Sequence, residues 1–110
     1  MRYLVVGSGG PGFASANEAL EILSGVVLPS FARLIELERQ KKILGGGLPV
    51  GERAFVFIIE AESNDELDRT LRQLPMWGVL DWKVTPLQTF GDRAMQEQQA
   101  VTELKETIKK

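Results

Sequence analysis

The sequence contains no cysteine and no histidine. Disulfides, thiolate nucleophiles, zinc centres built from these residues and imidazole-based acid–base catalysis are therefore excluded. Any chemistry in this chain must use carboxylates, lysine, arginine, tyrosine or backbone groups. The lack of cysteine also agrees with a reducing compartment, so we expect a cytoplasmic protein.

Excess charge of one sign and long apolar runs are also missing. The 13 Lys and Arg residues and the 15 Asp and Glu residues are interspersed and leave a net charge of −2, so we expect no nucleic-acid partner. The longest charge-free stretches, residues 3–17 and 22–32, fall short of the ~20 apolar residues of a membrane span, and we expect no membrane partner. With 110 residues, of which 44% are hydrophobic, the chain predicts one folded domain over residues 1–91 and a helical extension over 92–110.

A glycine-rich segment separates the first predicted strand from the first predicted helix. Residues 2–6 are β-branched and aromatic, which predicts a strand, and residues 7–12 then exclude regular structure. Ser15 and Glu18 have the spacing of a capping box, so a helix begins there. Its apolar positions recur at spacings of three and four, as expected for one buried stripe: Leu20, Leu23, Val27, Phe31 and Leu34.

A proline lies within this helical pattern and predicts an irregularity. Pro29 has no N–H for the carbonyl of Gly25, four residues earlier, and its ring would press against that carbonyl. We therefore expect a kink or a short break near Gly25, in a helical segment that ends around residues 39–42.

The second half of the chain predicts two strands, a helix, another strand and a tail helix. A short strand starts at residues 43–44, a turn-rich connection covers 45–51, and residues 54–59 are the strongest strand prediction. A second capping box, at residues 63–66, begins a helix that ends before Pro75 and has one apolar face, formed by Leu67, Leu71 and Leu74. Strand-like composition returns over residues 79–90, and a helix with a narrow apolar stripe follows from Asp92 and is expected to lie over a neighbouring surface.

This order of elements predicts an α+β, ferredoxin-like βαββαβ fold, with an antiparallel sheet and helices on one face. The strand at residues 54–59 is apolar on both sides, with Phe55, Phe57 and Ile59 on one face and Ala54, Val56 and Ile58 on the other. A sheet covered on one side only should be polar on its other side. We therefore expect a second copy to pack sheet to sheet, giving a dimeric α/β barrel; in a monomer the tail helix would have to cover this face.

The glycine-rich segment literally matches a dinucleotide-binding motif, but its context does not. That motif needs a second parallel strand ending in an acidic residue about 20 residues later, whereas residues 26–35 continue a helical pattern. We expect no nucleotide cofactor there. The segment is better interpreted as a flexible loop that can cover the mouth of a pocket.

Two charged pairs are the candidate catalytic residues. Asp81 and Lys83 alternate with the apolar residues of their strand, so both point to the side that the helices leave uncovered. If they are buried there, they form an acid–base pair. If they are exposed to solvent, they are little evidence for a site. Glu36 and Arg33 are the second pair, although such residues ordinarily form a solvated helix face.

Three aromatic residues are the candidate substrate contacts. Trp77 and Trp82 can stack a planar ligand, although two aromatics beside a helix end more often fill a core or an interface. Tyr3, on the first predicted strand, is the third candidate.

The residues from Leu74 to Leu87 resemble the muconolactone delta-isomerase family. A helix-ending Leu-Pro is followed by an apolar and an aromatic residue, then by a strand with Asp81 before an apolar-x-Val pattern. The resemblance extends upstream through residues 34–39, 54–60 and 63–67, and so covers roughly residues 30–90. It implies a ferredoxin-like barrel protomer, assembled as dimers or rings of dimers, and a cofactor-free isomerisation of an unsaturated lactone.

Such a reaction needs one group that carries a proton and another that holds the developing oxyanion. We expect Asp81 or Glu36 as the proton carrier, with Asp81 the more important because a strand holds a carboxylate more tightly, and Lys83 or Arg33 beside the oxyanion. The absence of histidine favours an alternative, a non-catalytic oligomeric binding or structural protein of the same barrel type. A pocket with converging polar groups would favour the enzyme, and a filled barrel the alternative.

Overall fold

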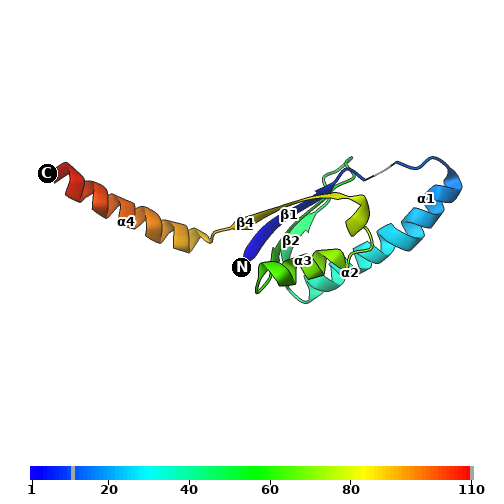
Figure 1. Ribbon diagram of the computed structural model, residues 1–110, viewed down its shortest axis with the longest axis horizontal. Coiled ribbons are helices and arrows are strands. Elements are labelled where there is room, and N and C mark those ends of the chain that lie inside the picture. The colour runs from blue at the N-terminus through cyan, green and yellow to red at the C-terminus, as the bar shows by residue number, and fades with distance from the viewer. Residues whose placement is uncertain (11, 110) are drawn as a thin grey trace.

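The computed structural model describes residues 1–10 and 12–109, which form one four-stranded antiparallel sheet and its helices. The strand order is β2-β3-β1-β4, with bounds β1 (Arg2–Ser8), β2 (Ile43–Gly47), β3 (Phe55–Glu60) and β4 (Asp81–Leu87). The helices are α1 (Ala16–Ile22), α2 (Leu28–Arg39), α3 (Asn64–Arg72) and α4 (Phe90–Lys109), with a π-helical segment (Leu23–Val27) and a short 3₁₀ turn (Trp77–Val79). The predicted α+β, ferredoxin-like fold is confirmed (Figure 1).

The core lies between the sheet and helices α2 and α3. Alternate residues of β1 and β3 face the helices and are at most 7% exposed: Tyr3, Val5, Phe55, Phe57 and Ile59. Leu37 of α2 and Leu67 and Leu71 of α3 pack against them. The alternation predicted for the strand at residues 54–59 is therefore confirmed.

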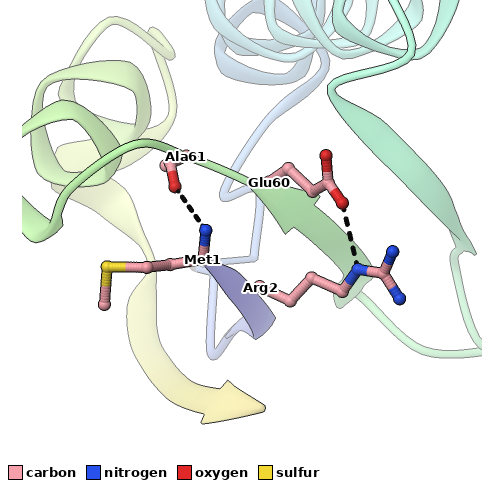
Figure 2. A network of polar contacts seen from close by, with 4 residues as sticks. All are labelled: Met1, Arg2, Glu60 and Ala61. Carbon is pink, nitrogen blue, oxygen red and sulfur yellow. Dashed lines mark hydrogen bonds and ion pairs between the residues drawn. The ribbon is translucent and has the colours of Figure 1, made fainter. Parts of the chain in front are cut away.

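The opposite side of the sheet is apolar at its centre. We call this side the open face; its central residues are Leu4, Val6, Val56 and Ile58, which are half-buried. Where β1 begins and β3 ends, Arg2 donates a hydrogen bond of 3.0 Å to Glu60. Beside it, the amino group of Met1 donates to the carbonyl of Ala61 at 2.9 Å (Figure 2). The tail helix does not cover this face, because α4 extends away from the sheet (Figure 1). Pairing of two open faces remains a prediction.

The irregularity predicted at Gly25 is a π-helical segment, Leu23–Val27, between α1 and α2. The N–H of Leu28 donates to the carbonyl of Leu23, five residues earlier, instead of the usual four. Pro29 follows in the first turn of α2, directly after this widened turn. The chain thus continues as helix through a widened turn without breaking.

Strand β2 extends further than expected. The turn predicted at residues 45–51 begins later, because Gly45, Gly46 and Gly47 pair with β3 after a register shift at Leu44. Gly46 has a φ of +141°, and a Cβ there would overlap the carbonyl of Val56. This close approach requires glycine.

Strand β4 starts at Asp81, later than the predicted strand at residues 79–90, because residues 77–79 form the 3₁₀ turn.

Both predicted capping boxes begin helices. The hydroxyls of Ser15 and Ser63 accept from the N–H groups of Glu18 and Glu66, each at 3.1 Å. The tail helix α4 starts at Phe90, two residues earlier than expected, and none of its residues is buried. It gives the chain its long axis, with extents of 73 × 26 × 23 Å. Within the described residues, no helix is long and apolar enough to cross a membrane.

Candidate functional site

An apolar pocket of about 280 Å³ opens beside the π-helical segment. We call it the π-helix pocket. The π-helical segment and α2 form one wall, the start of β3 a second, and the residues between α3 and β4 a third. Its lining consists of Gly10, Phe13, Ile22, Leu23, Val26, Val27, Phe31, Leu48, Arg53, Phe55, Met76, Val79 and Leu80.

Ser30 holds two walls of this pocket together. It is fully buried, its hydroxyl donates to the carbonyl of Val26 at 2.7 Å, and the N–H of Met76 donates to that hydroxyl at 3.1 Å. Val26 and Met76 both line the pocket. One side chain therefore fixes the distance between the π-helical wall and the segment that follows α3.

Arg53 is the charged residue among those lining the pocket. Its guanidinium lies 5.5 Å from the centre of the Phe13 ring, a cation–π distance. Gly10 also lines the pocket, so the loop after β1 contributes to its wall, and its role as a cover of the pocket mouth stays a prediction; Pro11 of that loop lies outside the described residues. Both sheet neighbours of β1 run antiparallel to it, unlike the adjacent parallel strands of a dinucleotide-binding unit.

No sequence pattern marks Arg53 or the apolar lining as a site. Arg53 belongs to no motif and lies two residues before the apolar strand β3. The sequence feature that pointed to this region was the glycine-rich loop, which was interpreted as a cover for the mouth of a pocket. It gave no information about the residues that form the rest of the pocket wall.

Asp81 and Lys83 lie on the open face, as their alternation predicted. In the register of β1 and β4, Asp81 is opposite Ser8 and Lys83 is opposite Val6, and both are exposed. The carboxylate of Asp81 stands close to Gly9, where a Cβ would lie 3.0 Å from Oδ2. Asp81 is thus next in sequence to Leu80 of the pocket, but points to the other side of the sheet.

The second charged pair lies apart from the first, on α2. Glu36 accepts hydrogen bonds from Arg39 at 2.9 Å and from Gln40 at 3.2 Å. Arg33 donates to Gln73 at 3.2 Å. The contacts of Glu36 lie within α2 and its C-cap, whereas Arg33 reaches the C-cap residue of α3, and all three hydrogen bonds are exposed.

The three aromatic candidates make structural contacts. Tyr3 is 1% exposed and donates its hydroxyl hydrogen to Asn64. Trp82 donates to the carbonyl of Trp77 at 2.9 Å, and the guanidinium of Arg72 lies 4.3 Å from the centre of the Trp77 ring. None of the seven residues predicted from the sequence lines the π-helix pocket.

The comparisons with known proteins agree with one another. The family model for muconolactone delta-isomerase matches residues 23–93, a range that holds most of the pocket lining. A crystal structure of muconolactone isomerase at 3.3 Å resolution superposes with a TM-score of 0.67 at 20% identity, covering 81% of this chain and 90% of that one. A 5-chloro-2-hydroxyhydroquinone dehydrochlorinase from Burkholderia phenoliruptrix AC1100, solved with 2,5-dihydroxybenzoquinone, gives 0.60 at 23% identity, covering 84% and 98%. No curated protein matches the sequence. At these identities the two solved structures establish a shared fold.

Proposed function

The chain belongs to the muconolactone delta-isomerase family, and from this premise we propose that it is a cofactor-free isomerase of a small unsaturated lactone or acid. The observation that carries the proposal is the π-helix pocket, which is apolar throughout except for Arg53. Its volume of about 280 Å³ suits a molecule with a single small ring. The cytoplasmic location inferred from the sequence forms part of the same proposal.

The proposed reaction moves one proton and changes no oxidation state. A base takes the proton from a carbon next to the carbonyl, and the electrons of that C–H bond move onto the carbonyl oxygen. The enolate then collapses as the proton is returned to a different carbon, which shifts the double bond. An apolar pocket favours this course, because a cation stabilises the enolate oxygen more strongly where water is excluded.

Arg53 is the cation that we propose for the substrate oxygen. Its planar guanidinium can hold a carboxylate or an enolate oxygen through paired hydrogen bonds. Lys83 on the open face and Arg33 on α2 remain alternatives from the sequence, but neither lines the pocket. Arg53 is therefore favoured over Lys83 and Arg33 because it lines the pocket.

We propose Asp81 as the proton carrier. It directly follows Leu80, a pocket residue, and its exposed carboxylate lies on the open face beside Gly9. In this proposal the substrate therefore extends from the pocket past Leu80 and Gly10 to reach that carboxylate. Glu36, the other candidate, already accepts hydrogen bonds from Arg39 and Gln40. A second copy on the open face would cover Asp81 and exclude water from it, so dimerisation supports this assignment.

Ultraviolet screening of unsaturated five-membered lactones with purified protein tests the proposal. Asp81→Asn keeps the shape of the side chain but removes the proton acceptor, and we expect kcat to fall by about 10²-fold or more. Glu36→Gln is the matched control and should retain activity, while Arg53→Gln should raise KM. If Asp81→Asn is fully active and Glu36→Gln is inactive, the proton carrier lies on α2 and the assignment is wrong.

One observation favours a second candidate, a non-catalytic small-molecule-binding protein of the same barrel type. The residues that line the π-helix pocket include no carboxylate, so the pocket alone has no group to carry a proton. In this case a lactone acid would bind with an Arg53-dependent affinity and be recovered unchanged. Calorimetry followed by product analysis separates the two functions.

A further inference from the structure

Helix α4 is the largest element that the proposed site does not use. It spans Phe90–Lys109, none of its residues is buried, and it extends away from the sheet (Figure 1). The family match ends at residue 93, so nearly all of this helix lies beyond the family pattern. Helices in proteins draw most of their stability from packing of an apolar face, and this 20-residue helix has no buried residue within its own chain.

The apolar residues of α4 form a narrow stripe with a seven-residue repeat. Spacings of four and three connect six positions, of which five are apolar and one, Glu97, is charged. We call them the α4 seam: Phe90, Ala94, Glu97, Val101, Leu104 and Ile108. A stripe confined to such positions is the seam of a coiled coil, and it fits against another helix of the same kind. The side chains of Leu104 and Ile108 are more than half exposed.

The start of α4 is defined by local hydrogen bonds. The hydroxyl of Thr89 accepts from the N–H of Asp92 at 3.1 Å and so caps the helix. The side chain of Gln88 donates to that of Gln96 at 2.8 Å, which holds the connecting residues against the first turns. Both contacts lie within residues 88–96, so they define where the helix starts.

We propose that the α4 seam pairs with the α4 seam of a second copy, with the two helices antiparallel. Parallel pairing would place Glu97 against Glu97 of the other copy within the seam, where like charges repel. Antiparallel pairing about a centre near residue 99 instead sets Glu97 opposite Val101. Glu97 then keeps its ion pair with Arg93, which measures 2.8 Å.

The sizes of the seam residues favour the same orientation. Antiparallel pairing sets Ala94, the smallest seam residue, opposite Leu104, and sets Phe90 opposite Ile108. Small and large side chains then fill the space between the helices together. The same surface of both copies is used, so the pair closes on itself with two-fold symmetry.

Sedimentation of the full chain at micromolar concentration tests whether the seam binds another copy. Leu104→Asp should reduce the assembled mass to half or less, because it places a charge in the seam. Met95→Asp is the matched control, since Met95 is 73% exposed on another side of the helix, and it should leave the mass unchanged. Equal masses for the wild type and Leu104→Asp would overturn the proposal.

Thiol cross-linking tests the orientation, and the lack of natural cysteine leaves no background. Ala100→Cys lies beside the proposed two-fold axis and should be joined into dimers by a short bismaleimide. Ile108→Cys should not be joined, because antiparallel helices place the two copies of this residue roughly 27 Å apart at ~1.5 Å per residue. Efficient linking of Ile108→Cys would show parallel pairing, and no linking of Ala100→Cys would show that the seam docks on a different surface; either result overturns the proposal.

Discussion

Ser30 shows how one side chain determines the shape of the candidate site. Polar groups buried away from water need partners, and this hydroxyl has one on each side: the Val26 carbonyl and the Met76 N–H. Both partners belong to residues of the pocket wall. Nothing in the local sequence marks Ser30, because Met76 lies 46 residues away.

We predict that Ser30→Ala lowers the free energy of unfolding by about 1–3 kcal/mol, because it leaves the N–H of Met76 buried without an acceptor. Ser24→Ala is the control, since Ser24 also donates to a carbonyl four residues earlier but is exposed. Its effect should stay within about 0.5 kcal/mol. Denaturant titration measures both, and equal effects would contradict the role given to Ser30.

The candidate site could be predicted only as far as local periodicity reaches. The alternation of β4 correctly put Asp81 and Lys83 on the side away from the helices, because the period of a strand is a local property. The pocket depends on contacts between distant segments. Arg53 and Phe13, for example, meet across 40 residues, and no pattern in the sequence connects them.

At the scale of elements, the π-helical segment connects the sequence to the pocket. The Gly25 and Pro29 pair predicted an irregularity correctly, but its form could not be predicted, because a kink and a π turn both relieve the clash with proline. Strand β2 was placed too short, because Gly45 and its neighbours become a strand only by pairing with β3. Such pairing is decided by tertiary structure and not by local propensity.

We predict that Gly25→Ala raises the free energy of unfolding by about 0.5–1 kcal/mol, since alanine restricts the unfolded chain and favours helix. A Cβ on Gly25 meets nothing within 4 Å. Gly46→Ala is the comparison with the opposite sign, because its φ of +141° and the Val56 carbonyl leave no place for a Cβ. Thermal unfolding distinguishes them, and a destabilising Gly25→Ala would contradict the described environment of the π-helical segment.

At the scale of the whole molecule, two apolar surfaces stand out among the described residues: the open face of the sheet and the α4 seam. The open face carries β-branched and leucine side chains at its centre, bordered by the half-exposed Arg2–Glu60 ion pair. Contiguous apolar surface of this kind usually marks an interface. The sequence predicted this surface from a single strand, because apolar residues on both sides of β3 required something beyond the helices to cover them.

We predict that two copies associate through their open faces, so Ile58→Glu should lower the assembled mass measured by light scattering. The reason is that the new carboxylate would have to be buried without a partner in the pair. Val50→Glu is the control, because Val50 is fully exposed in the turn before β3. A wild-type chain that stays monomeric at micromolar concentration would contradict the prediction.

Proton transfer is the step on which the proposed isomerase activity depends, and nuclear magnetic resonance in heavy water measures that step directly. The wild-type protein, without added metal or cofactor, should shift the double bond of an unsaturated lactone acid and place deuterium on the product carbon. Asp81→Asn should slow this incorporation by about 10²-fold or more. The contradicting result is a set of unsaturated lactone acids that bind in the π-helix pocket but show no protein-dependent deuterium incorporation. The protein would then be a small-molecule-binding protein and not an isomerase.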